Sequence, residues 1–240
     1  MTEAPVAPRL RDLLYGFLFY VIALILFGFG VRVVQGLAAP MHGADPRLVT
    51  RVPIPMSVTL AGHGVVMGGI AFRYLWRRYG QRLHDWGVQS NAISRTLLIG
   101  ISVGMVAKGV FAIANLLVVA LTGQRTLTPA TVQWLSPATP VAARVAVIAE
   151  LCILIPVAEE LFFRGFVFGV LRTRYHLIVA LLVTNIWFAA VHLDSVVGAF
   201  LFGIVLSLVY ERTRSLAAPV VGHATYNAIA ALVTIFDVPG

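Results

Sequence analysis

The chain contains seven long apolar runs separated by short polar segments, and this pattern constrains the fold more than any other feature. A helix needs about 20 apolar residues to cross the hydrocarbon core of a bilayer. The fifth and sixth runs are short, so we expect those helices to be tilted in thin lipid or shielded inside the bundle. The runs are Leu13–Val31, Pro53–Phe72, Thr96–Leu121, Val141–Val170, Leu177–Val191, Val196–Tyr210 and Leu216–Phe236.

The low content of charged residues supports a membrane protein. Only 12% of the 240 residues are charged, and 59% are hydrophobic. A soluble domain carries about 25% charged residues, because it must cover a surface that faces water. We therefore predict an all-α polytopic membrane bundle of about seven transmembrane helices.

The arginines indicate how the chain is oriented. Although the formal net charge is +8, the basic residues cluster in short segments between the runs, which argues against a nucleic-acid-binding surface. With a cytoplasmic N-terminus, eleven arginines lie on the cytoplasmic side: Arg9, Arg11, Arg73, Arg77, Arg78, Arg82, Arg95, Arg172, Arg174, Arg212 and Arg214. Four lie on the other side: Arg32, Arg47, Arg51 and Arg125. We predict a multi-pass protein of the cell membrane with its N-terminus in the cytoplasm and its C-terminus outside.

Two adjacent acids stand inside the fourth run. Ionisable groups at membrane depth cost about 2.5–3.5 kcal/mol each, so they usually pair or serve a function. Glu160 and Arg164 are four residues apart and can pair on one helix face, as a lock between helices or as part of a site. Glu159 is turned about 100° away, which leaves it free to act as a general base. Pro156 cannot donate to the Cys152 carbonyl, so we expect a kink or local opening there.

Two more polar groups lie in later runs. Asn185, Phe188 and His192 recur at spacings of three and four and therefore line one helix face. His223 and Asn227 share a face of the last helix, and two converging donors of this kind can hold an oxyanion. The structural alternatives are an interfacial histidine at a helix end and a polar contact between helices.

Together these residues resemble the CPBP family, which comprises type II CAAX prenyl endopeptidases and bacteriocin-processing enzymes and is also called the Abi family. The resemblance covers about Val145–Ala230, and an ordered triple of motifs in a membrane chain is a specific signal. The segment Arg212–Pro219 is also similar to the family. The three motifs are Glu159-Glu160-x-x-x-Arg164, Phe188-x-x-x-His192 and His223-x-x-x-Asn227.

The resemblance implies an intramembrane endopeptidase that cleaves a membrane-associated peptide or protein, which can be lipidated. In the family's glutamate-dependent scheme, Glu159 and His192 activate a water, while His223 and Asn227 hold the oxyanion. The supporting residues would be Glu160, Arg164 and Phe188. Residues 1–140 would form a variable three-helix region and residues 141–240 a four-helix catalytic core, within one integrated membrane domain.

Several alternatives remain open from the sequence. Zinc could be bound by Glu159, His192 and His223, because carboxylates and imidazoles are zinc ligands. The chain has no His-Glu-x-x-His motif, and Arg164 opposes a nearby cation, so we predict chemistry without a metal or other cofactor. A non-catalytic membrane scaffold or bacteriocin-immunity protein could share the fold. A proton-coupled transporter is disfavoured, because the chain lacks duplicated halves.

Two intramembrane residues lie outside these motifs. Lys108 is the only lysine and lies midway along the third run, where Glu150 is a possible partner for an ion pair. His63 lies within residues 62–69, whose four glycines indicate close helix packing. The motif residues also lie at different depths on straight helices, so we expect a recessed cavity that brings them together.

Overall fold

The computed structural model describes residues 9–38, 56–81, 93–123, 135, 139–192 and 195–237. Within this part of the chain the fold is all-α, with seven helices and no strand. Six of the helices are long and apolar enough to cross a bilayer, and α8 (Leu177–Ala190) is shorter. The predicted all-α membrane bundle is therefore confirmed.

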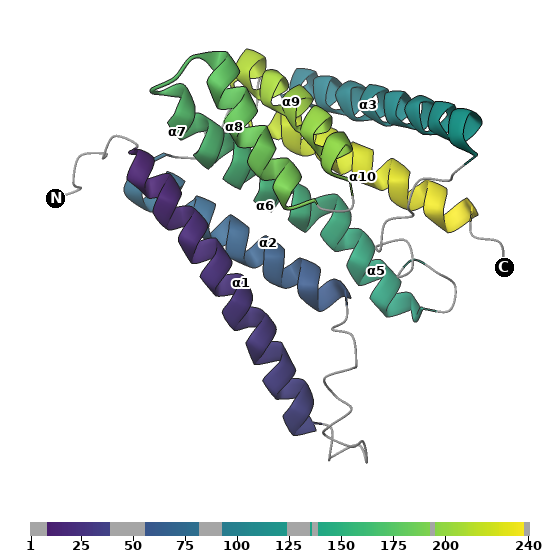
Figure 1. The fold of residues 1–240 in the computed structure, drawn as a ribbon, viewed down its shortest axis with the longest axis horizontal. Coiled ribbons are helices and arrows are strands. Elements are labelled where there is room, and N and C mark those ends of the chain that lie inside the picture. The colour runs from purple at the N-terminus through teal and green to yellow at the C-terminus, as the bar shows by residue number, and fades with distance from the viewer. Residues whose placement is uncertain are drawn as a thin grey trace.

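The fourth helix, Val141–Arg172, is a composite that changes its helical register twice. Its segments are α5 (Val141–Ala149), η5 (Glu150–Leu154), α6 (Ile155–Glu160), η6 (Leu161–Phe168) and α7 (Gly169–Arg172), and both η segments are π-helical. The remaining helices are α1 (Leu10–Ala38), α2 (Met56–Phe72) with its π-helical extension η3 (Arg73–Arg78), α3 (Ile93–Thr122), α8, α9 (Val196–Thr213) and α10 (Ala217–Asp237) (Figure 1).

The sixth run forms a longer helix than expected. The apolar run ends at Tyr210, but α9 continues to Thr213 and meets the length of a candidate span. The helix stops at Arg214, which adopts a left-handed backbone conformation with φ of 51°. Of the two runs predicted to be short, only the one that forms α8 remains short.

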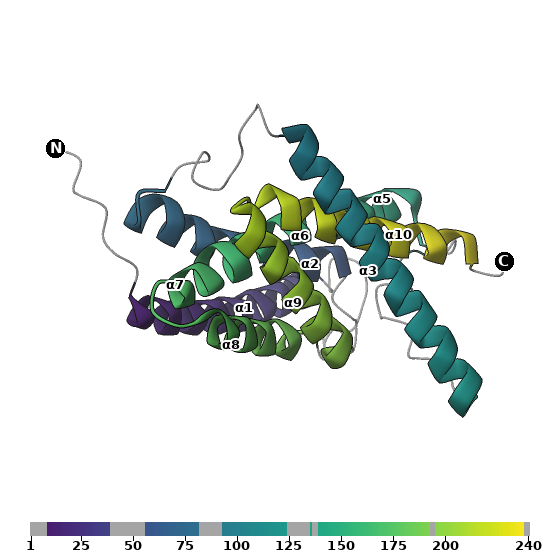
Figure 2. The same ribbon diagram turned by 90° about the horizontal axis from the view of Figure 1, so that it is seen from above.

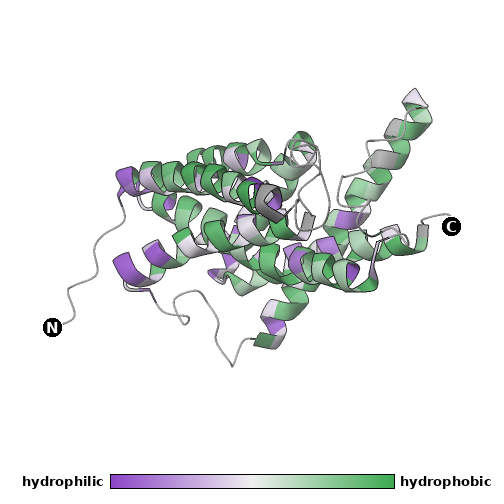
Figure 3. Cartoon of the chain, turned by 90° about the horizontal axis from the view of Figure 1, so that it is seen from below, coloured by the Kyte–Doolittle hydropathy of each residue, from purple (hydrophilic) through white to green (hydrophobic). Residues whose placement is uncertain are grey.

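The outer surface of the bundle is apolar. Figure 3 shows hydrophobic residues along most of every helix, with hydrophilic ones gathered mainly near helix ends and inside the bundle. In α1 only 6% of the most apolar 18-residue window is buried. In water a contiguous surface of this kind would cause aggregation, whereas lipid solvates it. The chain is therefore a multi-pass membrane protein.

Close packing against α6 positions α2. A side-chain carbon at Gly64 would lie 2.9 Å from Leu154 Cγ, and one at Gly68 would lie 3.4 Å from Ala158 Cβ. These glycines are four residues apart and share one face, which lets the two backbones approach. The packing predicted from the glycine cluster is confirmed, and it brings the neighbouring His63 up to α6.

A second pair of glycines positions α3 against α10. Side-chain carbons at Gly100 and Gly104 would lie 2.7 Å from the Ala218 carbonyl oxygen and 2.7 Å from Thr225 Cβ, respectively. Figure 2 shows α3 crossing α10, and the two helices are in contact. Pairs of glycines one turn apart thus hold α2 against the composite helix and α3 against α10.

A buried acid anchors the start of α1 near the end of α2. Asp12 is only 2% exposed and forms an ion pair of 3.0 Å with Arg78 Nη2. The Tyr79 hydroxyl also donates to Asp12 over 3.1 Å. Burial and the adjacent Asp12 carboxylate raise the pKa of Tyr79 above its ordinary value, so the phenol stays a donor. This contact fixes α1 against α2.

Candidate active site

A cavity of about 560 Å³ contains the four residues predicted to be catalytic, namely Glu159, His192, His223 and Asn227. This volume is typical of sites that take a small ligand or a short peptide segment. Apolar side chains such as Ile155 form much of the wall. The cavity expected from the differing depths of the motif residues is therefore present.

Glu159 lies at the centre of the site and is 2% exposed. Its Oε2 atom lies 3.8 Å from His192 Nε2 and 4.0 Å from His223 Nε2. Both distances are too long for direct hydrogen bonds, and Oε2 has no hydrogen-bond partner among the described residues. The acid of α6 and the two imidazoles, one beyond the end of α8 and one in α10, therefore surround a space that a small polar group could bridge.

His192 lies two residues beyond the end of α8, and its orientation is set by Phe188. The His192 Nδ1–H donates to the Phe188 carbonyl over 2.7 Å. A carbonyl can only accept, so this contact assigns the proton to Nδ1. In the neutral ring, the lone pair on Nε2 then faces Glu159. The Phe188 ring also packs 4.5 Å from the His192 ring and 4.7 Å from the Arg164 guanidinium carbon, measured to ring centroids.

Glu160 and Arg164 form the predicted ion pair, and both side chains are fully buried. Arg164 Nη1 donates to Glu160 Oε1 over 2.8 Å, and Arg164 Nη2 donates to the Gly203 carbonyl of α9 over 3.0 Å. Glu160 Oε1 also accepts from His223 Nδ1 over 2.9 Å. The pair therefore orients the His223 ring and joins the composite helix to α9.

Asn227 is held by a carbonyl that the composite helix leaves free. In the π-helical turn η5, the Ile155 N–H donates to the Glu150 carbonyl, five residues back. The same register would bring Pro156 to the Leu151 carbonyl, but proline has no N–H. Asn227 Nδ2 donates to this Leu151 carbonyl over 2.8 Å. The expected opening near Pro156 is therefore present, at Leu151 rather than Cys152, and Asn227 keeps one N–H for another acceptor.

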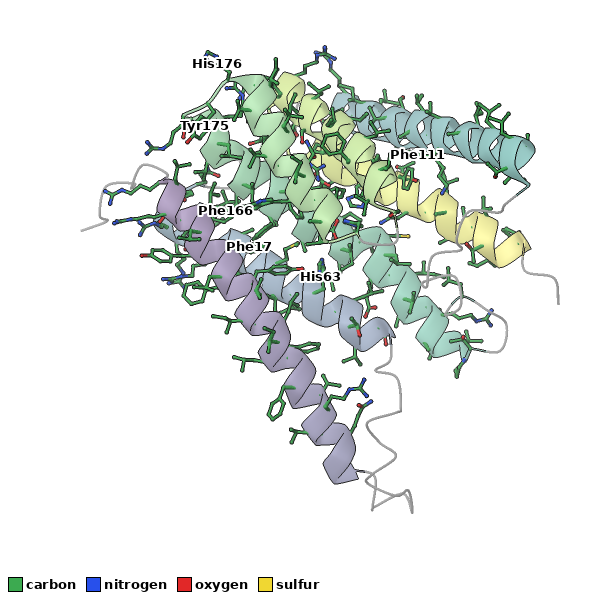
Figure 4. The ribbon with its side chains drawn as sticks, viewed as in Figure 1. Phe17, His63, Phe111, Phe166, Tyr175 and His176 are labelled. Atoms are coloured by element: carbon green, nitrogen blue, oxygen red, sulfur yellow. The ribbon has the colours of Figure 1, made fainter. Side chains whose placement is uncertain are left out.

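His63 of α2 is a site residue that the sequence analysis assigned only to packing. Its Nε2 lies 3.3 Å from Glu159 Oε1, and its Nδ1 lies 2.9 Å from the hydroxyl of Tyr20 in α1. Figure 4 labels His63 where α2 faces the composite helix. An imidazole at membrane depth is a signal of function in itself, although its spacing in the sequence gives no partner.

Two other polar residues that the sequence analysis named, Asn185 and Lys108, have different contacts from those expected. Asn185 Nδ2 donates to the Leu181 carbonyl and to Ser207 Oγ, so it joins α8 to α9 outside the cavity. The ion pair considered between Lys108 and Glu150 is wrong. The Lys108 ammonium lies 4.7 Å from the centroid of the Tyr226 ring and lines the cavity.

The zinc alternative lacks the expected geometry. Glu159, His192 and His223 lie together, but the described residues contain no group of three or more histidine, cysteine, aspartate or glutamate residues arranged to hold a metal. His63, which is not one of these three residues, contacts Oε1 of Glu159, whereas His192 and His223 both face Oε2. The donor set therefore fits a network of hydrogen bonds and water better than a metal shell.

The C-terminal part of the bundle matches a known protein family. Residues 141–229 match the family described as Rce1-like, type II CAAX prenyl endopeptidase. The chain carries a domain of this family. All seven residues singled out by the resemblance lie inside the Rce1-like domain, whereas Tyr20, His63 and Lys108 lie before it. Neither the curated proteins nor the solved structures gave a match.

Proposed function

We propose that this protein is an intramembrane endopeptidase that hydrolyses a peptide bond of a membrane-associated substrate. The observation that carries the proposal is the buried Glu159 Oε2, which has no hydrogen-bond partner among the described residues and faces His192 Nε2 across 3.8 Å. One water between these two atoms can donate a hydrogen bond to each of them. Membership of the Rce1-like family supports the same reaction and a peptide substrate.

In the proposed reaction, Glu159 and His192 act together on that water. They take a proton from it as its oxygen attacks the carbonyl carbon of the peptide bond. The proton then passes to the amide nitrogen, so the carbon–nitrogen bond breaks and a carboxylate and an amine are released. The apolar walls of the cavity strengthen the electrostatic interactions in this step.

His223 and Asn227 would hold the oxyanion. A His223 ring with a proton on each nitrogen can donate from both. In that state Nδ1–H donates to Glu160 and Nε2–H is free to donate to the oxyanion. The second N–H of Asn227 supplies the other donor, while the first is held by Leu151.

His63 would keep the general base in one orientation. With the Tyr20 hydroxyl donating to Nδ1, the proton of the neutral imidazole lies on Nε2 and is donated to Glu159 Oε1. Oε1 then accepts this hydrogen bond, and Oε2 is the atom that meets the water. This arrangement gives the two oxygens of one carboxylate separate tasks.

The decisive test is Glu159→Gln in the full-length protein, since the amide keeps the shape and removes the base. We expect cleavage of a membrane-associated peptide to fall by about 10²- to 10⁴-fold, the usual contribution of a general base. Quantitative membrane proteomics of peptides lost in the variant strain would identify the substrate. Glu150→Gln is the matched control, because Glu150 lies on the same composite helix but outside the cavity.

Other outcomes separate the alternatives. Full peptide cleavage by Glu159→Gln would contradict the proposal. An unchanged cellular phenotype, with no cleavage by either protein, would favour a scaffold or immunity protein on the same fold. Loss of proton coupling without any cleavage would instead favour a transporter.

The reaction as proposed needs no metal. We therefore expect cleavage to survive exhaustive dialysis of the purified protein against a zinc chelator. A loss of activity that added zinc restores would contradict this prediction and favour zinc held by Glu159, His192 and His223.

A further inference from the structure

Lys108 is a half-buried cation for which the proposed reaction has no use. It is the only lysine in the chain and lies in the middle of α3. Cations at membrane depth are rare, and they usually face a cavity or a partner of opposite charge. The surroundings of this side chain therefore indicate what it is for.

The packing of α3 on α10 fixes where Lys108 points. Gly104 approaches the Gly222 carbonyl, and Lys108 and Tyr226 lie four residues further along their respective helices. The ammonium consequently lies over the Tyr226 ring, 4.7 Å from its centroid. The stem is held by helix packing while the charged end reaches the cavity.

No carboxylate among the described residues compensates this charge. Their ion pairs within 4.0 Å involve arginine and histidine side chains, and none includes Lys108. The Tyr226 ring attracts a cation through its face but offers no acceptor for three N–H donors. The ammonium therefore has donors available for an anionic group that enters the cavity.

The same cavity joins Lys108 to the proposed reaction centre. The Tyr226 ring stacks on the Phe202 ring, with centroids 4.5 Å apart. The Phe202 and His223 rings meet edge to face, with centroids 5.4 Å apart. Tyr226 follows His223 by three residues, or roughly 4.5 Å along the helix axis. An extended peptide advances about 3.3–3.6 Å per residue. A peptide whose carbonyl lies at His223 can therefore bring a group a few residues away to Lys108.

We propose that Lys108 binds a carboxylate of the substrate peptide, located a few residues from the cleaved bond. This inference rests on the proposed function, because it assigns the part of the same cavity that the reaction leaves unused. The carboxylate can belong to the end of the peptide chain or to an acidic side chain. In either case, one charge-assisted contact sets how far the peptide enters and which bond reaches Glu159.

Peptide binding tests the inference without any need for turnover. The full-length Glu159→Gln protein in phosphatidylcholine nanodiscs would be titrated with three fluorescent farnesylated peptides. The first has a free C-terminal carboxylate, the second a C-terminal amide, and the third a C-terminal amide with one glutamate near that end. Dissociation constants would be measured for this protein and for the same protein carrying Lys108→Met, Lys108→Arg or the exposed control Arg214→Gln.

We expect a carboxylate to strengthen binding by about 10- to 100-fold over the neutral amide, the usual range for a charged hydrogen bond. Lys108→Met should abolish this difference and leave the affinity for the neutral peptide unchanged. Lys108→Arg should keep part of it, and Arg214→Gln all of it. Comparison of the first and third peptides identifies the source of the carboxylate.

Three results would overturn the inference: no preference for a carboxylate in the parent protein, the same preference in Lys108→Met, or no binding of any peptide. Lys108→Met replaces a charge at membrane depth with an apolar side chain of similar length, and a thermal melt in detergent would verify its folding. Failure of the cleavage test with Glu159 intact is a separate result, since binding does not require cleavage.

Discussion

At the scale of single residues, the most informative feature is the unequal treatment of the two Glu159 oxygens. Oε1 contacts His63, whereas Oε2 faces His192 and His223 without a hydrogen bond among the described residues. A carboxylate with both oxygens free could rotate and present either one. The contact from α2 removes that freedom, so the effect of His63 should appear in the rate of the chemical step.

His63→Ala should therefore lower kcat by about 10- to 100-fold with little change in KM, since it removes one hydrogen bond to a charged group. His63→Gln should recover part of the loss, because its amide N–H can reach the position of Nε2. Tyr20→Phe should have a smaller effect, because it leaves the His63 ring in place and removes only the hydroxyl that fixes its tautomer. Steady-state kinetics with a peptide substrate would measure kcat and KM for each variant. Equal losses in the alanine and glutamine variants, or a change in KM alone, would contradict a positioning role.

The residues of the site differ in how far the sequence could predict them. Glu160 and Arg164 are four residues apart on one helix, so their pairing follows from local geometry. The contact between His63 and Glu159 depends on how α2 packs against α6, and no spacing along the chain encodes that distance. The ion pair considered for Lys108 failed for the same reason, because α10 places Tyr226 beside the ammonium.

At the scale of elements, the composite helix couples its backbone to the site. Its π-helical turn η5 and Pro156 leave the Leu151 carbonyl without a backbone donor, and Asn227 of α10 occupies it. The sequence indicated an opening at the proline, because the missing N–H is a property of the residue itself. The shift in register that moves the free carbonyl to Leu151 comes from the turn, which no local pattern indicated.

Pro156→Ala tests this coupling. The new backbone N–H would compete with Asn227 for the Leu151 carbonyl, so the Asn227 amide would lose its fixed orientation. We expect activity to fall by about two- to tenfold, the range for one neutral hydrogen bond, without loss of thermal stability. Pro140→Ala, at the start of the same composite helix, is the matched control. Unchanged activity in Pro156→Ala would show that Asn227 needs no anchor.

At the scale of the whole molecule, the Rce1-like domain is flanked by helices that precede it in the chain. In Figure 1, α1 and α2 lie on one side of the composite helix and α3 lies along α10. The number of helices and their apolar surfaces could be predicted, because span length and hydrophobicity are local properties. Which helices pack together could not, because in lipid the choice depends on small residues and shape rather than on burial of apolar surface.

The orientation in the membrane remains a prediction from the arginines. Eleven arginines on one side and four on the other favour a cytoplasmic N-terminus and an external C-terminus. Green fluorescent protein fused to the N-terminus should fluoresce, and alkaline phosphatase fused to the C-terminus should be active. The reverse pattern would contradict the orientation, and activity of both reporters at both ends would indicate dual insertion.

The contacts of α2 and α3 also bear on how such a protein can be recombined. The family match begins at residue 141, so a chimaera could join residues 141–240 to three helices taken from an unrelated membrane protein. Such a hybrid would keep every motif that defines the domain. It would lose both His63, which contacts Glu159, and Lys108, which lies over the Tyr226 ring. If the proposed roles of His63 and Lys108 hold, such a hybrid should cleave slowly and with little selectivity, because both residues precede the residues that match the family.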